Sequence, residues 1–196
     1  GKKGMTVDSL LKQTCEWLLG TGPNSDIVMS SRIRLARNMD KMPFSHWATK
    51  KQEKEILESL ERAVLGTEMM GNGLHVRMAE IDDVDKQFLL ERHLVSREHI
   101  VHPEAKSVII GDKEVVNVMI NEEDHLRIQV MQSGFSLQEC WRIATRLDDS
   151  LHQKVKYAFS AEWGYLTACP TNTGTGLRAS VMLHLPSLVM TKQISR

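Results

Sequence analysis

Apolar and polar residues alternate along several stretches of this chain, as they do in strands that bury only one face. Short apolar runs on both sides of the turn dipeptide Asp112-Lys113 predict a hairpin, and two other apolar runs predict further strands. The strands expected from these patterns are residues 26–38, 74–80, 107–111, 114–120, 125–132, 165–169 and a last one from 178.

Segments with apolar residues at helical spacing lie between these strands. They are residues 9–19, with Leu10, Leu11, Leu18 and Leu19 as the apolar positions, and residues 49–66, 82–94 and 136–156. Thr49 with Gln52, and Ser136 with Glu139, fit capping boxes at the starts of the second and the fourth helix. The fourth carries one apolar stripe, in which Trp141 is expected to be a core residue. Together the elements indicate an α+β domain with a mainly antiparallel sheet flanked by helices.

The length, charge and hydropathy of the chain argue against some classes of protein. The chain has 196 residues, of which 41% are hydrophobic, so a single domain over residues 1–196 with a sizeable core is expected. Its 25 basic and 25 acidic residues give a net charge of zero, which argues against a general nucleic-acid partner. The apolar runs are too short to span a membrane.

The N-terminal residues and the cysteines point to a reducing cytoplasm. Residues 1–4 carry two lysines with no apolar stretch behind them, so we expect a vector-derived remnant before a native Met5 rather than a signal peptide. The three cysteines are far apart in the sequence and lack the spacing of a zinc site.

The first alternating segment carries Arg32 and Arg34 on one face together with Ser30. Residues two apart on a strand are separated by roughly 7 Å. Two guanidinium groups at that spacing suit the oxygens of a phosphate, which they can bind bidentately. The alternative is that both arginines are solvated charges on an edge strand.

A second segment, Asn121–Arg127, places Glu123 and Arg127 on the polar side of the next alternating strand. A carboxylate beside a phosphate-binding arginine could accept a proton from a positively charged nucleophile or orient it. The alternative is an ordinary solvated turn, because three acids stand in a row at 122–124.

A third segment, Cys169–Arg178, is rich in glycine and threonine. Its glycines allow the backbone to approach a ligand closely, and main-chain N–H groups in such a loop can bind an anion. Arg178 then begins a strand in which Ser180 and Met182 share its face. Cys169 is either a buried core thiol or a thiolate whose pKa is lowered by the arginines.

These three segments, Ser30–Arg37, Asn121–Arg127 and Cys169–Ala179, resemble in sequence and order the motifs of the guanidino (phosphagen) kinases, which include creatine kinase and arginine kinase. The small-molecule kinases of that family carry an additional N-terminal domain. Here 29 residues precede Ser30, and this short lead, together with the tract Leu90–Leu94, resembles the bacterial protein-arginine kinases.

The resemblance implies an ATP site. The family's arginines at the matching positions hold the phosphates and the transferred phosphoryl group, and His93 matches a nucleotide-contacting position. Magnesium would be held mainly by phosphate oxygens and water, so no protein metal ligand is expected. The residues implied to contact ATP are Ser30, Ser31, Arg32, Ile33, Arg34, His93, Arg127, Arg178, Ala179, Ser180, Val181 and Met182.

The resemblance also implies two catalytic residues. Glu123 matches the carboxylate that binds the substrate guanidinium and acts as its base. Such a base is needed because an arginine side chain is essentially always protonated and has no free lone pair for attack. Cys169 matches the reactive cysteine beside the guanidinium, where a thiolate would favour its charge and orientation.

The implied activity is an ATP-dependent protein-arginine kinase that marks proteins for Clp-type proteolysis and inactivates a heat-shock repressor. Its implied partners are proteins with exposed arginines, a zinc-binding activator protein, that repressor and a Clp ATPase. The family's last nucleotide-binding loop and second guanidinium-binding carboxylate find no match before Arg196. We therefore expect an incomplete catalytic domain with weak activity.

Two other interpretations stay open. One is a kinase for free arginine or another small guanidine, which the missing N-terminal domain disfavours. The other is a catalytically inactive module that binds phosphoarginine or partner proteins. Outside the three motifs, His99 and His102 are expected at the surface, and Lys50, Lys51 and Lys54 are expected to form a solvated start of a helix.

Overall fold

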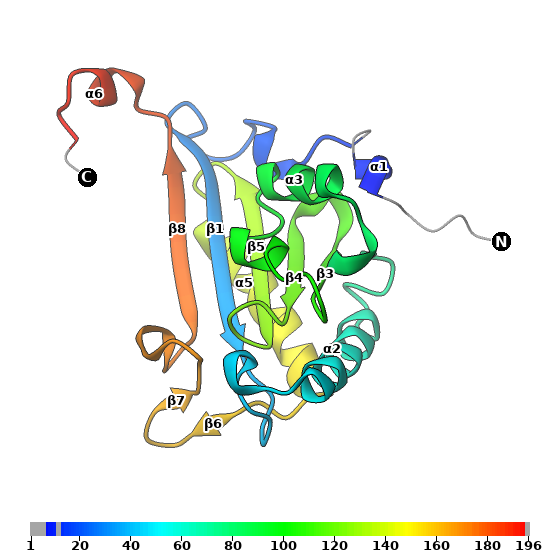
Figure 1. The fold of residues 1–196 in the computed structure, drawn as a ribbon. Helices are drawn as coiled ribbons and strands as arrows, with labels where there is room; N and C mark the ends of the chain where they lie inside the picture. Colours follow the sequence, from blue (N-terminus) through cyan, green and yellow to red (C-terminus); the bar gives the residue numbers. More distant parts are fainter. Residues whose placement is uncertain (1–6, 11–12, 195–196) are drawn as a thin grey trace.

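The computed structural model describes residues 7–10 and 13–194 and is built around a six-stranded antiparallel sheet (Figure 1). The strand order is β2-β3-β4-β5-β1-β8, and β6 and β7 form a separate two-stranded ribbon. The strands are β1 (Val28–Arg37), β2 (Leu74–Arg77), β3 (Ser107–Ile110), β4 (Val116–Ile120), β5 (Leu126–Ser133), β6 (Phe159–Ser160), β7 (Gly164–Tyr165) and β8 (Leu177–Leu183). The expected α+β class with a mainly antiparallel sheet is confirmed.

The α-helices lie on both faces of the sheet (Figure 1). They are α1 (Val7–Leu10), α2 (Lys50–Leu65), α3 (Asp83–Glu91), α4 (Arg97–Ile100), α5 (Leu137–His152) and α6 (Pro186–Met190). Short 3-10 helices are η1 (Glu16–Leu18), η2 (Ser45–Trp47), η3 (Met78–Glu80), η4 (Asp112–Glu114) and η5 (Pro170–Asn172). None of the helices in the described part of the chain is long and apolar enough to cross a membrane.

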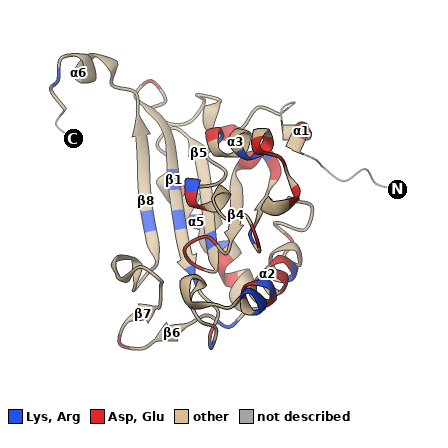
Figure 2. Cartoon of the chain, in the orientation of Figure 1, with Lys and Arg blue, Asp and Glu red and all other residues tan. Residues whose placement is uncertain are grey.

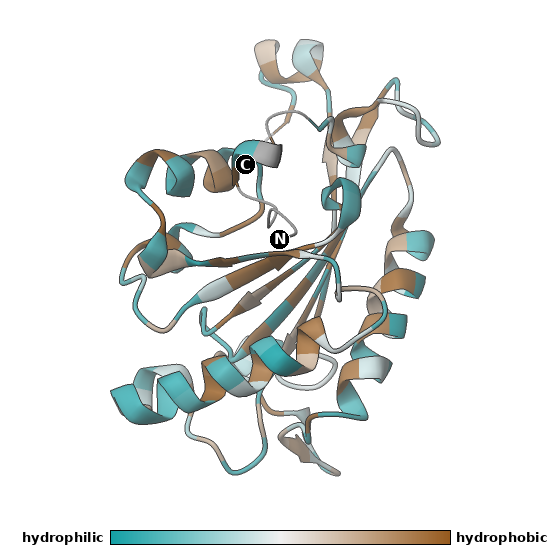
Figure 3. Cartoon of the chain, turned by 90° about the vertical axis from the view of Figure 1, so that its right-hand side faces the viewer, coloured by the Kyte–Doolittle hydropathy of each residue, from teal (hydrophilic) through white to brown (hydrophobic). Residues whose placement is uncertain are grey.

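The two faces of the sheet are covered differently. On one face, α2 and α5 pack against the apolar side of β1, β4 and β5 and form the larger core, which includes Ile33, Leu60, Ile128 and Ala144. On the other face, α1 and α3 cover β2, β3 and β4, where Leu89 packs with strand residues. Figure 3 shows the hydrophobic residues concentrated on the strands and on the helix sides that face them. η1 also covers the Met131 end of β5, so this second face is left open over β1, β8 and the part of β5 that carries Arg127.

Helix α2 begins as the sequence predicts. The Thr49 hydroxyl accepts a hydrogen bond from the Gln52 amide at 3.3 Å, and the Gln52 side chain accepts one from the Thr49 amide at 2.9 Å. Such a cap typically stabilises a helix by about 1 kcal/mol. The apolar stripe of this helix, with Ile56 and Leu60, is fully buried.

The predicted helix over 9–19 is wrong in its extent. The chain forms α1, leaves the helical path, and forms a short η1, with Cys15 in an extended conformation between them. Cys15 and Trp17 are buried against Met131 of β5, and this packing outweighs the local helical spacing. Leu18 and Leu19 are about half exposed. Leu11 and the proposed remnant at 1–4 lie outside the described residues.

The capping box predicted at Ser136 does not form. The Ser136 hydroxyl donates to the Ser133 carbonyl at 3.0 Å, and the Glu139 carboxylate accepts from Arg142 at 2.8 Å. Trp141 is 43% exposed and is not the core residue that its position in the stripe predicted.

Two further predictions need correction. The apolar run at 165–169 forms a strand only at Gly164–Tyr165, because the Leu166 carbonyl accepts from the Asn38 side chain and the Ala168 amide donates to the Asp124 side chain. His99 is fully buried rather than at the surface, and its Nε2–H donates to the Ser107 carbonyl at 3.0 Å. His102 is exposed as expected, and so are Lys50, Lys51 and Lys54.

Candidate active site

The strand register brings four arginines onto the open face of the sheet. Arg34 of β1 lies opposite Arg178 of β8 on one side and opposite Gln129 of β5 on the other. Arg32 lies opposite Ser180, and Arg127 lies opposite Ala36 of β1. Because residues directly opposite in an antiparallel pair share a face, Arg32, Arg34, Arg127 and Arg178 project together. Figure 2 shows blue Lys and Arg segments next to one another on β8, β1 and the adjoining part of the sheet.

The interpretation of Arg32 and Arg34 as solvated charges on an edge strand is wrong. β1 is hydrogen-bonded to β5 and to β8, and both arginines are only partly exposed. Arg32 Nε donates to the Ser180 hydroxyl at 3.3 Å, which holds one guanidinium across the strand pair.

Three of the four arginines in this cluster have no ion-pair partner among the described residues. Burial, together with Arg32, Arg127 and Arg178, lowers the pKa of Arg34 to about 10. Burial, followed by the charges of Arg178 and Arg127, also lowers the pKa of Arg32. Among the described residues, no carboxylate forms an ion pair with Arg32, Arg34 or Arg178. An anion with several oxygens would relieve this repulsion, and guanidinium groups bind phosphate oxygens well.

Three adjoining clefts on this face form one continuous groove, which we call the arginine groove. The clefts are joined by shared residues, since Arg32 and His93 line two of them and Arg34 and Arg127 line two. The polar residues that line the arginine groove are Ser30, Arg32, Arg34, His93, Ser96, Glu123, Arg127, Gln129, Asn172, Arg178 and Ser180. Val181 and Met182 line its end near Ser30.

His93 lies in this groove with an unusual backbone, at φ +59°. Its ring packs 5.5 Å from the ring of Trp17, and its carbonyl accepts a hydrogen bond from the Gln129 side chain at 2.7 Å. Burial and the charge of Arg32 lower the pKa of His93 below its ordinary value, which favours the neutral form of the ring. Gln129 was not singled out from the sequence, although it shares the polar parity of Arg127.

The acid turn, residues 122–124, closes one end of the arginine groove. Glu122 is buried, and its carboxylate accepts hydrogen bonds from Ser96 at 2.7 Å and from the Glu123 amide at 3.0 Å. The same carboxylate forms an ion pair with Arg127 at 2.8 Å. Glu122 and Asp124 are buried, so the interpretation of this segment as a solvated turn is wrong for both.

Glu123 is the acid of this turn that stays accessible. Its side chain is 45% exposed and one carboxylate oxygen lies 3.7 Å from Arg127. Burial, followed by the charges of Asp124 and Glu122, raises the pKa of Glu123 above its ordinary value. A carboxylate with a raised pKa is a better proton acceptor than an ordinary surface glutamate.

Asp124 and Asn38 tie the acid turn to the loop that carries Cys169. One Asp124 oxygen accepts from the Asn38 side chain and from the Ala168 amide, both at 2.7 Å. Asn38 also donates to the Leu166 carbonyl at 3.0 Å. Cys169 is partly exposed, with its Sγ 2.9 Å from the Thr171 hydroxyl, so its interpretation as a buried core thiol is wrong.

Arg37 fixes the other end of the same loop. This buried guanidinium forms an ion pair with Asp148 of α5 at 2.7 Å and donates to the Thr175 carbonyl at 2.9 Å. It also lies 3.6 Å from the centroid of the Tyr165 ring. The role of Arg37 was not inferred from the sequence, although it shares the parity of buried Ile33 on β1.

Gly176 explains why the loop must be rich in glycine. It has φ +62°, and a Cβ there would lie 2.6 Å from the Ala36 carbonyl oxygen. Its own carbonyl accepts from the Ala36 amide at 2.9 Å, so the loop joins β1 directly beside the arginines.

Some residues expected to contact ATP face away from the arginine groove. Ser31 is fully buried on the opposite face, where its hydroxyl donates to the Gly134 carbonyl at 2.7 Å. Ile33 belongs to the core beneath α2 and α5, and Ala179 shares its face by register. The side chains of these three residues do not line the arginine groove. In the part of the chain described, no three His, Cys, Asp or Glu side chains gather in a metal-binding arrangement.

Comparison with known proteins shows which family has this sequence pattern. The model of the ATP:guanido phosphotransferase C-terminal catalytic domain matches residues 52–196. A protein-arginine kinase from Symbiobacterium thermophilum is 49% identical over 183 residues, which cover 92% of this chain and 52% of that protein. A protein-arginine kinase from Halothermothrix orenii is 46% identical over 191 residues, covering 96% and 54%. The chain thus spans about half the length of the curated relatives it matches.

Solved structures share the fold. The substrate-free duplicated taurocyamine kinase from Schistosoma mansoni superposes with a TM-score of 0.76 at 28% identity, over 84% of this chain and 25% of that one. Lombricine kinase gives a TM-score of 0.76 at 24% identity, over 91% of this chain and 55% of that one. The fold is that of a phosphagen-kinase catalytic domain, and the chain belongs to the ATP:guanido phosphotransferase family.

Proposed function

We propose that this protein transfers the γ-phosphoryl group of ATP to arginine side chains of proteins. The observation that carries the proposal is the position of Glu123, which lines the same cleft as Arg34, Arg127 and Arg178. A base that can hold a guanidinium therefore lies beside a set of phosphate-binding charges. The match to relatives named protein-arginine kinase supports a protein as the acceptor.

In this proposal the four arginines bind the phosphates and the phosphoryl group in flight. Their charges oppose one another before ATP binds, and the triphosphate oxygens compensate them. A magnesium ion held through phosphate oxygens would supply further charge neutralisation. The groove fits this arrangement because its four arginines provide donors for phosphate, while Glu123 is the one carboxylate among its described lining residues.

Glu123 makes the acceptor nucleophilic. Its carboxylate aligns the arginine guanidinium and takes one N–H proton as the N–P bond forms. At the same time the bond between the γ-phosphorus and the bridging oxygen breaks, and ADP leaves with that electron pair. Cys169 is assigned the task of orienting the guanidinium from the loop that Asp124 and Asn38 hold in place.

The biological roles follow from the family resemblance. We propose that phosphorylated arginines mark proteins for a Clp-type protease, and that a heat-shock repressor is one substrate. A zinc-binding protein is the proposed activator. The phosphoryl transfer itself requires none of these partners.

Phosphorus NMR at neutral pH tests the proposed function. The protein is mixed with MgATP and either an unstructured arginine-containing protein or free arginine. An acid-labile N–P signal on the protein acceptor is expected. A signal on free arginine alone would identify a small-guanidine kinase instead. Silence with both acceptors, despite MgADP binding, would favour an inactive binding module.

A further inference from the structure

A second and larger hollow lies on the other side of the acid turn, and we call it the α2 groove. It has a volume of about 1040 Å³. Its walls are η2 with the first half of α2, the end of β2 with η3, and the loop 101–106. Leu57 and Ala79 provide apolar surface, while Lys54 and Glu104 provide charge of both signs.

Glu123 lines both the α2 groove and the arginine groove. Its half-exposed carboxylate is therefore the point where the two grooves meet. Glu122 also lines the α2 groove, but its buried carboxylate is already paired with Arg127, so Glu123 supplies the accessible negative charge at this junction. A cationic group that enters along the α2 groove reaches Glu123 without crossing the arginines, whose charge would repel it.

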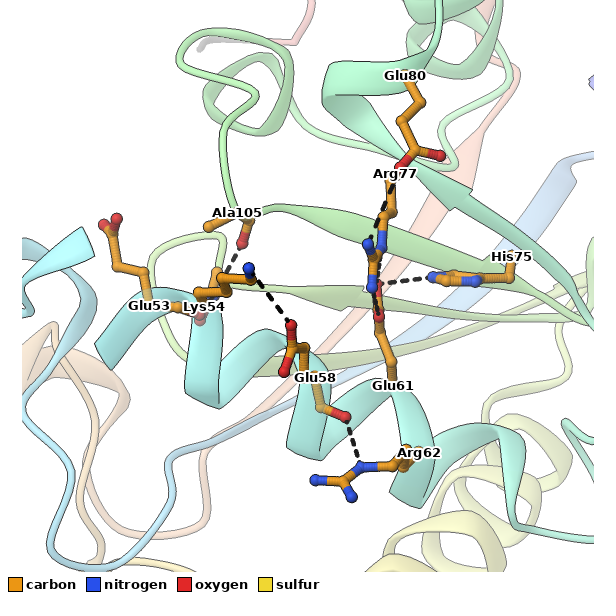
Figure 4. A network of polar contacts seen from close by, with 10 residues as sticks. Glu53, Lys54, Glu58, Glu61, Arg62, His75, Arg77, Glu80 and Ala105 are labelled. Carbon is orange, nitrogen blue, oxygen red and sulfur yellow. Dashed lines mark hydrogen bonds and ion pairs between the residues drawn. The ribbon is translucent and has the colours of Figure 1, made fainter. Parts of the chain in front are cut away.

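The walls of the α2 groove are held by specific contacts (Figure 4). The Asn121 side chain donates to the Glu53 carbonyl at 2.9 Å and to the Ala105 carbonyl at 2.8 Å, which joins loop 101–106 to α2. Arg77 forms an ion pair at 2.7 Å with the buried Glu61 of α2. A groove fixed in this way exists before any ligand binds, so little ordering is required on binding.

The size and chemistry of the α2 groove fit a polypeptide better than a single guanidine. A volume near 1000 Å³ is at the upper end for small-molecule sites, and an arginine side chain would fill only a small part of it. Apolar and charged wall positions together suit a chain with a polar backbone and varied side chains. The accessible Glu123 carboxylate at the inner end complements one guanidinium.

We infer that the α2 groove binds the polypeptide on either side of the acceptor arginine, with the guanidinium at Glu123 and the flanking residues along α2. This inference rests on the proposed function and adds to it a recognition surface for the acceptor. Contacts between this surface and the flanking residues make an arginine within a polypeptide bind more tightly than free arginine.

Competition binding tests this inference. A fluorescein-labelled peptide of glycine and serine with one central arginine is titrated with the protein, and anisotropy is recorded. Unlabelled peptide and arginine capped at both ends as a single residue are the competitors. We expect capped arginine to compete at least about tenfold more weakly, since it makes no contact along α2.

Ala79→Trp fills the groove at an exposed position of η3, away from Glu123. It should weaken peptide binding by about tenfold and leave the binding of capped arginine and MgADP unchanged. Val84→Trp adds the same side chain at an exposed position of α3 outside the groove and should change none of the three. Glu104→Trp, at an exposed position of loop 101–106, is a second variant expected to behave as Ala79→Trp does.

The inference is overturned if peptide and capped arginine compete equally, if both groove variants bind the peptide as the wild type does, or if the peptide shows no saturable binding. Failure of the proposed function has a different signature. In that case the peptide binds in the α2 groove but no N–P signal appears with any acceptor.

Discussion

Arg34 of β1 and Arg178 of β8 lie directly opposite each other on the open face of the sheet. Two like charges at such positions destabilise an antiparallel pair. Arg32 and Arg127 add to the repulsion and, with burial, lower the pKa of Arg34. The sheet thus holds a cluster of positive charge that costs stability in the absence of an anion, which is the expected property of a preorganised phosphate site.

Replacing Arg34 by glutamine should weaken MgADP binding without lowering the stability of the fold. Loss of charge-assisted hydrogen bonds should weaken MgADP binding by about 1.5–3 kcal/mol. Relief of the repulsion with Arg178 should leave the free energy of unfolding unchanged or raise it by about 0.2–1 kcal/mol. Titration calorimetry and urea unfolding measure the two quantities.

Arg142→Gln is the matched control, because Arg142 lies on the exposed side of α5 and pairs only with Glu139 among the described residues. It should change neither quantity by much. An Arg34→Gln protein that binds MgADP normally, or that loses more than about 1 kcal/mol of stability, would show that Arg34 is structural.

Arg37, unlike Arg34, should be needed for stability, because its side chain is buried and paired with Asp148. Arg37→Ala leaves that carboxylate buried without its partner and should lower the free energy of unfolding by about 3–5 kcal/mol. It also removes the donor to Thr175, so amide exchange should become faster in the loop 170–176. A loss below about 1 kcal/mol, similar to that of Arg142→Ala, would contradict this role.

His99 makes stability depend on pH. Burial lowers its pKa from 6.5 to about 3, so the unfolded chain takes up a proton at a higher pH than the folded one. The stability due to neutral His99 is complete above pH 6.5 and is lost as the pH falls toward 3, by up to about 1.4 kcal/mol per pH unit.

Below pH 6.5, wild type should lose stability relative to His99→Gln, which does not titrate. Urea unfolding at pH 7 and pH 5 measures the difference. A constant difference between wild type and His99→Gln across this range would refute the assignment.

Much of the fold could be predicted because local patterns and tertiary packing agree. Alternation in β1, β5 and β8 placed the arginines on one face, and the capping box located the start of α2. The position of β1 inside the sheet was not available from its own residues. It depends on β8, which pairs with β1 across about 140 residues of intervening sequence.

The errors occur where a distant contact overrides a local preference. Ser136 uses its amide to donate to Ser31 at 2.9 Å, and its hydroxyl contacts Ser133, so its capping box is lost. His99 is buried because Ser107 of β3 offers it a carbonyl partner. The links made by Asn38 and Asp124 were missed for the same reason, since they join segments that the sequence separates by 86 residues.

The most direct test of the account compares phosphoryl transfer and nucleotide binding in Glu123→Gln. Glutamine keeps the size of the side chain and cannot accept the guanidinium proton. Single-turnover transfer from MgATP to an arginine-containing protein should be abolished, while MgADP binding measured by calorimetry stays within about twofold of the wild type. Equal loss of transfer and binding, or normal transfer, would contradict the assignment of Glu123 as the base.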